Sequence, residues 1–290
     1  MNGRIVHTGV ILTALLTAIV SASAATTWTG GGGDRDWDNN ANWDNNAPGV
    51  GDDAIIGAGA DVLLTNATDN LNSLTMSDGT LTFSNWTTRL QATTVDIEGG
   101  TVTHAGPYAW TNTVMSNRVY IVCTDLSLGS SGSIDVDQKG YLDLEGPAPG
   151  ENTTVPGGAG HGGRGGGRGG AFGGVTYDSA TQPDEPGSGG GHNGNPGDRT
   201  YLSGGGVVKI EADDVLLNGM ITANGGDQAN SRHGGGAGGA IWIDCQTFDG
   251  TNGTVRANGG AGGSLGGGAG GGRIALDYTT MEPTCSVSLS

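Results

Sequence analysis

The chain has 290 residues, of which 60 are glycine, and it carries 12 Lys and Arg residues against 29 Asp and Glu. The net charge of −17 argues against nucleic acid as a partner, because phosphate binding needs clustered Lys and Arg side chains. The glycines keep no three-residue period, which excludes collagen, and their number disfavours a helical bundle, since each costs about 1 kcal/mol in a helix relative to Ala.

Residues 1–24 have the pattern of a secretory signal peptide. Arg4 precedes an apolar run over residues 10–20, and Ala22-Ser23-Ala24 fits a small-x-small cleavage site. The apolar run is too short to span a bilayer comfortably, so we expect no membrane-spanning segment after the signal is removed. The mature protein is predicted to begin near Ala25 and to be secreted or held at the cell surface.

Segment 25–57 is rich in Trp and Asn and is predicted to form an N-terminal cap. It places Asp34, Asp36 and Asp38 at alternate positions, a spacing that can supply three oxygen ligands to Ca²⁺ from one tight turn. A polar turn between packed Trp side chains explains the same pattern without a metal. Calcium is therefore a hypothesis for these three residues, and no other cofactor is expected.

Segment 58–146 contains a short repeat. Leu74 and Val95 are 21 positions apart, and the strand patterns around them match. The predicted strands of three successive units are 73–76 and 80–83, then 94–97 and 101–103, then 119–123, 126–128 and 133–136. Paired short strands in tandem units are typical of one coil of a solenoid.

Segment 147–206 interrupts the repeat as a glycine-rich insertion. Twelve of the 18 positions from Gly157 to Gly174 are glycine. Two interpretations are open: a disordered linker, or extended polyglycine segments that lie side by side with the runs 234–239 and 266–272. We expect order in the two shorter runs, because they occupy matched positions of the repeat.

Segment 207–290 repeats with a longer unit. Val208, Ile241 and Ile274 follow one another at intervals of 33 residues, and the residues around each alternate between apolar and polar. The chain as a whole is thus predicted to be all-β, a right-handed parallel β-helix with a glycine-rich loop insertion. An antiparallel sandwich is the competing fold.

The repeat also places the cysteines. Its alignment puts Cys123 and Cys245 in one inward column with one coil between them, about 9.6 Å apart. A disulfide needs Cα atoms within about 7 Å, so both are predicted to be buried free thiols.

The opening segment resembles the start of many secreted bacterial β-solenoid proteins, including autotransporter-type passengers. The residues that carry this resemblance are Trp28-Thr29-Gly30, Trp37, Asn42-Trp43, Pro48 and Asp52-Asp53-Ala54-Ile55-Ile56. The later Gly-Gly-x-Ile-x-Ile and Ala-Asn-Gly-Gly units resemble the glycine-rich repeats of bacterial surface proteins. This resemblance implies a structural or adhesive protein, with extracellular polysaccharide or other surface proteins as partners.

Catalysis would require carboxylates that converge in a groove. Candidate acids are Asp96, Asp135, Asp137 and Asp213, and Glu211, Asp244 and Asp277 share one outward column. No spacing singles out a pair, so a scaffold without catalytic activity is preferred. The alternatives are a carbohydrate-active β-helix of the pectin-lyase-like kind and a calcium-stabilised glycan-binding module.

Overall fold

The computed structural model describes residues 24–106, 116–167, 169–193, 202–227, 232–282 and 285–290. Nearly all of the predicted signal peptide and part of the predicted insertion lie outside these described residues. Within them, regular secondary structure consists of thirteen strands and one 3-10 turn, η1 (Asn40–Asn42). The prediction of an all-β protein is confirmed.

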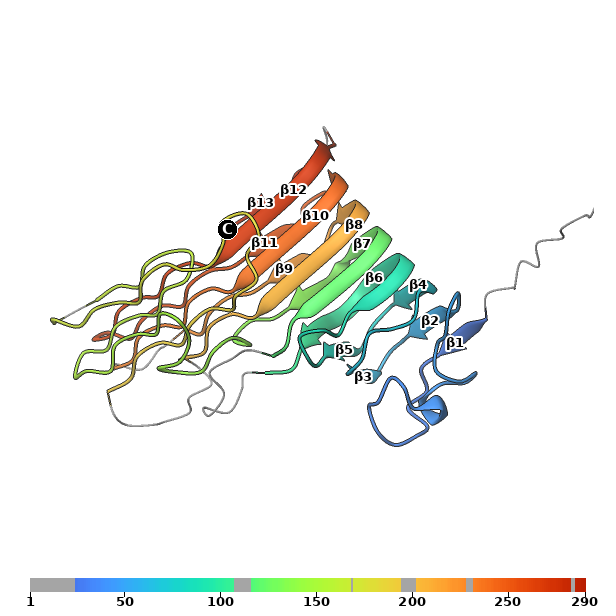
Figure 1. Ribbon diagram of the computed structural model, residues 1–290, viewed down its shortest axis with the longest axis horizontal. Helices are drawn as coiled ribbons and strands as arrows, with labels where there is room; N and C mark the ends of the chain where they lie inside the picture. The colour runs from blue at the N-terminus through green and yellow to red at the C-terminus, as the bar shows by residue number, and fades with distance from the viewer. Residues whose placement is uncertain (1–23, 107–115, 168, 194–201, 228–231, 283–284) are drawn as a thin grey trace, which may run out of the picture.

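The strands stack in parallel, as Figure 1 shows. In chain order they are β1 (Ala25–Thr27), β2 (Asp53–Ile56), β3 (Asp61–Leu64), β4 (Leu71–Met76), β5 (Thr80–Phe83), β6 (Leu90–His104), β7 (Val119–Asp135), β8 (Val207–Leu217), β9 (Met220–Thr222), β10 (Ala240–Asp249), β11 (Thr254–Arg256), β12 (Arg273–Met281) and β13 (Ser288–Leu289). We call the succession β1-β2-β4-β6-β7-β8-β10-β12 the main stack. A second succession runs β3-β5-β6-β7-β9-β11-β13.

The predicted register of both repeats is confirmed. Leu74 pairs with Val95 across the 21-residue repeat, and Val208, Ile241 and Ile274 stand in line across the 33-residue repeat. The insertion leaves this order intact, because β7 pairs directly with β8. The polypeptide leaves the stack after β7 and returns as β8, the strand that pairs next to β7.

The predicted division of each unit into separate short strands is wrong for β6 and β7. Each is one long strand that pairs in both successions, with an irregularity between Ile97 and Gly99 where β6 changes partners. Gly100 at this bend has a φ of +84°, and a Cβ there would meet the backbone of the preceding coil. Glycine lets the strand turn without ending.

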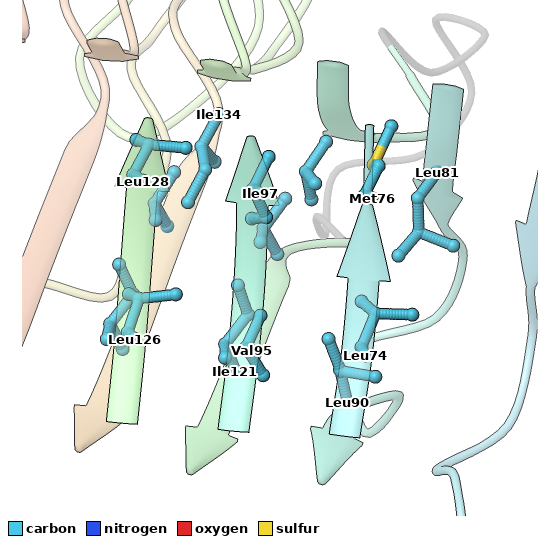
Figure 2. Packing of buried hydrophobic residues seen from close by; sticks show 14 of the residues in the cluster. Leu74, Met76, Leu81, Leu90, Val95, Ile97, Ile121, Leu126, Leu128 and Ile134 are labelled. Atoms are coloured by element: carbon cyan, nitrogen blue, oxygen red, sulfur yellow. The ribbon is translucent and has the colours of Figure 1, made fainter. Parts of the chain in front are cut away.

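The core is a set of aliphatic columns enclosed by the two successions (Figure 2). One column runs Leu74, Val95, Leu126 and Val215, all at most 3% exposed. Each side chain packs on its counterpart one coil away, because a parallel in-register stack repeats the same face at every rung. The residues that alternate with them point outward, where they contact solvent and each other.

The glycine runs form a second region, beside the stack in Figure 1. We call this region the glycine bundle and define it by the described residues of 157–174, 187–191, 203–206, 223–227, 234–239 and 257–272. Its extended segments bond to neighbours on more than one side: Gly205 N donates to Ala237 O, and Gly205 O accepts from Gly187 N. A Cβ at Gly204 would overlap the carbonyl oxygen of Gly187. The described glycine runs of the insertion are therefore packed side by side, the second of the two interpretations.

Candidate functional site

The outer face of the main stack carries a ladder of aromatic and cationic side chains. The Arg118 guanidinium carbon lies 4.7 Å from the ring centre of Trp86 and 4.6 Å from that of Tyr120. Lys209 Nζ lies 4.8 Å from the Tyr120 ring centre and 4.4 Å from that of Trp242. We call these five residues the cation–π ladder. Lys209 of β8 lies against rings of the coils before and after it, so these cation–π contacts join successive coils.

Carboxylates complete the ladder. Glu211 accepts from Tyr120 Oη at 2.6 Å and pairs with Lys209 at 2.7 Å, and Asp277 accepts from Trp242 Nε1 at 3.2 Å. Burial and the hydrogen bond to Glu211 raise the pKa of Tyr120 to about 12. Burial acts to raise the pKa of Glu211, but the bonds from Lys209 and Tyr120 outweigh it and hold that pKa below its usual range. Glu211 and Asp277 thus connect the ladder's cation and rings through hydrogen bonds and one ion pair.

The four candidate catalytic acids lie at separate places in the fold, and three of them accept hydrogen bonds from the neighbouring coil. Asp135 accepts from Thr222 Oγ1 at 3.3 Å, and Asp137 accepts from the backbone and side-chain nitrogens of Asn224 at 2.6 and 3.0 Å. Asp213 accepts from Gln246 Nε2 at 2.8 Å. Burial is the main cause that raises the pKa of Asp135. These bonds link one coil to the next.

Asp96 and the outward column of carboxylates belong to the main stack. Asp96 stands in register between Thr75 and Ser127. The predicted column is confirmed, since Glu211, Asp244 and Asp277 are in register on adjacent strands. Two members of this column, Glu211 and Asp277, accept hydrogen bonds from side chains of the ladder.

The N-terminal cap is built on three Trp side chains. Trp43 lies edge-on to Trp28 and Trp37, with ring centres 5.2 and 4.9 Å apart, and Trp43 Nε1 donates to Trp37 O at 2.8 Å. Asn42, fully buried, donates from Nδ2 to Asp34 Oδ1 at 2.6 Å and to the backbone oxygen of Asp36 at 2.9 Å. Aromatic packing and one amide side chain therefore fix the loop that carries the acidic residues.

The three predicted calcium ligands bond to protein donors. Asp34 accepts from both Asn42 and Asn39, and these bonds, with the amide of Asp36, lower its pKa. Asp36 accepts from the Asp38 amide at 3.1 Å, and Asp38 accepts from Asn66 Nδ2 at 2.7 Å. Among the described residues no three His, Cys, Asp or Glu side chains form a group that could hold a metal ion. Calcium remains a prediction that this geometry does not favour.

Comparison with known families adds one finding. Residues 42–155 match the family model of the G8 domain. This G8-like segment is less than half of the chain and runs from the cap through β7 into the predicted insertion. Comparisons with curated proteins and with solved structures gave no match. The described part of the chain contains no helix with the length and apolar character needed to cross a membrane.

Cys123 lies near the start of β7, the last strand of the G8-like segment, and Cys245 lies beyond that segment in β10. Cys123 is in register with Ala212 and Cys245 with Tyr278, but the predicted inward position is wrong for Tyr278, which is 46% exposed. Both cysteines are free, but only Cys245 is buried; Cys123 is half-buried, and the two line a groove of about 450 Å³. Burial raises the pKa of Cys123 to about 12 and that of Cys245 to about 11, so both thiols stay protonated at neutral pH.

Two fully buried histidines lie in contrasting environments, one at the end of β6 in the G8-like segment and one in the glycine bundle. His104 Nδ1 lies 2.8 Å from Ala105 O and its Nε2 accepts from Val207 N, so the ring is neutral and burial lowers its pKa to about 4. His161 Nδ1 faces Gly238 O at 2.7 Å and Nε2 faces Asp178 at 3.1 Å. Each nitrogen of His161 therefore faces an oxygen atom, a backbone carbonyl on one side and a carboxylate on the other.

Sequence reasoning missed the ladder and the His161–Asp178 pair. Lys209 and Trp242 are 33 residues apart, so the repeat alone places them side by side on the outer face. Arg118 precedes its strand, and His161 and Asp178 lie in the insertion, where no repeat applies. Their contacts follow from the path of the chain outside the stack.

Proposed function

We propose that this protein is a secreted or cell-surface structural protein, adhesin-like and without catalytic activity, built on a right-handed parallel β-helix. The proposal rests on the contacts that the polar side chains of the protein make. The cation–π ladder and the acids Asp135, Asp137 and Asp213 bond across coils rather than toward a common point. Side chains committed to neighbouring coils support a scaffold.

The location outside the cytoplasm rests on the sequence. The pattern over residues 1–24 is that of a cleaved signal peptide. N-terminal sequencing of material secreted by an expressing cell should begin near Ala25. Intact Met1 in the mature protein would reject export.

A carbohydrate-active enzyme is the alternative function, and a polysaccharide cleavage assay tests it. Purified protein should leave acidic and neutral polysaccharides uncleaved, with and without added Ca²⁺. Asp135 is the acid to follow, because its pKa is raised, as that of a general acid would be. Reproducible cleavage that is lost in Asp135→Ala, but kept in the matched outer-face variant Asp96→Ala, would overturn the scaffold and establish a carbohydrate-active enzyme.

A further inference from the structure

We infer that a pocket in the N-terminal cap binds a neutral sugar residue, such as the terminal unit of an extracellular glycan. The pocket has a volume of about 290 Å³ and lies between the loop after β1 and the turn from β2 to β3. This inference deepens the adhesive part of the proposed function, on which it rests for its extracellular setting. It assigns the ligand to a site away from the cation–π ladder.

The pocket has one aromatic wall and small residues around it. Trp28 forms that wall, with Gly30 against its indole nitrogen, and Gly33, Ala58 and Gly59 leave the mouth open. No hydrogen-bond acceptor for Trp28 Nε1 is found among the described residues, whereas Trp43 Nε1 has the Trp37 carbonyl. An indole with its N–H turned to a polar cavity presents an apolar body and a donor together.

Charged groups that line the same pocket retain free bonding capacity. Arg35 uses Nη2 for Asp61 Oδ1 at 2.7 Å and for Thr82 Oγ1 at 3.1 Å, so within the described chain its Nε and Nη1 hydrogens are unused. Asp61 Oδ2 likewise has no donor among the described residues, and Asp34 Oδ2 receives one bond, from Asn39. The pocket lining thus offers both donors and acceptors.

A pocket lined by both hydrogen-bond donors and acceptors suits a neutral ligand with several hydroxyl groups. A hydroxyl group both donates and accepts, so adjacent sugar hydroxyls can bond to a guanidinium and a carboxylate that lie side by side. The carboxylates of Asp34 and Asp61 outnumber the single guanidinium of Arg35 in the pocket lining, so the lining repels an anion. An acidic sugar is therefore disfavoured by charge.

The pocket is also fixed before a ligand arrives. Asn42 holds Asp34, and backbone bonds from Leu63 N to Arg35 O at 2.6 Å and from Trp37 N to Leu63 O at 3.0 Å fasten the loop to β3. A rigid wall loses little entropy on binding. For a ligand of hexose size we expect a dissociation constant of about 1 mM.

The test follows the indole N–H signal of Trp28 by NMR in the full mature chain, with Trp28→Phe to assign it. Glucose, galactose, mannose and N-acetylglucosamine are the neutral probes, and galacturonic acid is the anionic one. At least one neutral sugar should shift the signal saturably, and galacturonic acid should bind at least tenfold more weakly. Absence of saturation by every neutral probe, or equal binding of galacturonic acid, would overturn the site.

Two conservative variants locate the binding. Arg35→Lys keeps the charge but loses the fork of donors, and Asp61→Asn keeps the shape but loses the carboxylate; each should weaken binding about tenfold or more. Asp96→Asn, on the outer face of the stack, should change nothing. Unaltered affinity in both pocket variants, with native unfolding temperatures, would place the ligand elsewhere. Failure here leaves the scaffold proposal standing, since polysaccharide cleavage is what decides that proposal.

Discussion

The strand stack and the glycine bundle solve the same problem of packing in opposite ways. In the stack, side chains such as Ile241 and Ile243 fill the interior, and the backbone bonds only to the coil on either side. In the bundle the backbone itself fills the interior, and the space a side chain would take is occupied by a neighbouring carbonyl group. Burial therefore means side-chain packing in one region and the exclusion of side chains in the other.

The largest effect is expected from a charge in the stack. Ile243→Asp places a carboxylate at a position that is 1% exposed, where its aliphatic neighbours offer no partner. We expect the free energy of unfolding to fall by about 4 kcal/mol, as measured by urea denaturation. Asp244→Asn, on the outward side of the same strand, is the matched control and should change it by less than about 0.5 kcal/mol. Equal effects of the two would show that Ile243 is not part of a core.

The joint between the two regions should be sensitive to acid. The folded chain holds the His104 ring neutral with a pKa of about 4, against an ordinary 6.5. The unfolded chain therefore binds the proton first as pH falls, and stability should drop by about 3 kcal/mol between pH 6.5 and 4. Denaturation of the protein and of His104→Gln across this range isolates the contribution, because the variant cannot titrate there. Parallel pH profiles would contradict a buried neutral His104.

A single methyl group should test the bundle. A Cβ at Gly272 would overlap the carbonyl oxygen of Gly239, whereas a Cβ at Gly271 would meet nothing nearer than Ala257 O at 3.7 Å. Gly272→Ala is expected to cost about 2 kcal/mol through overpacking. Gly271→Ala should be neutral or slightly stabilising, because alanine restricts the unfolded chain. Thermal unfolding of the two variants compares them directly, and a ranking in the other order would refute the packed bundle.

The smallest effect is expected in the cation–π ladder. Lys209→Met keeps the aliphatic stem but removes the charge that lies over Tyr120 and Trp242. We expect a loss of about 1 kcal/mol, since these contacts are partly exposed. A double-mutant cycle with Trp242→Leu should give a coupling of a few tenths of a kcal/mol or more, against none with the distant Trp37→Phe. Strict additivity at Trp242 would remove the ladder as a link between coils.

The sequence predicted the stack better than the bundle for a physical reason. Alternating side chains at Val208, Ile241 and Ile274 record both the face and the spacing of a strand, so the register could be derived. Glycine carries no such record, and the order of the run from Gly157 to Gly174 depends on neighbours distant in the chain.

The candidate site followed the same division. Trp28, Asp34 and the rest of the cap were recognised as a unit, but the pocket depends on a contact between Arg35, in the loop after β1, and Asp61 of β3. The calcium hypothesis arose because alternate carboxylates have the same spacing in a metal loop and in a hydrogen-bonded turn. The positions of Asn39, Asn42 and Asn66, whose side chains donate to Asp34 and Asp38, favour the hydrogen-bonded turn.

The close contacts of the glycine bundle have a consequence at the level of the gene. A codon for alanine or leucine in the stack can mutate to another small or aliphatic residue that occupies the same column. Any missense change of a glycine codon introduces a Cβ atom, which at Gly204 or Gly272 has nowhere to go. Single-nucleotide changes can therefore remodel the stack stepwise. The bundle is open to change through the insertion or loss of whole segments.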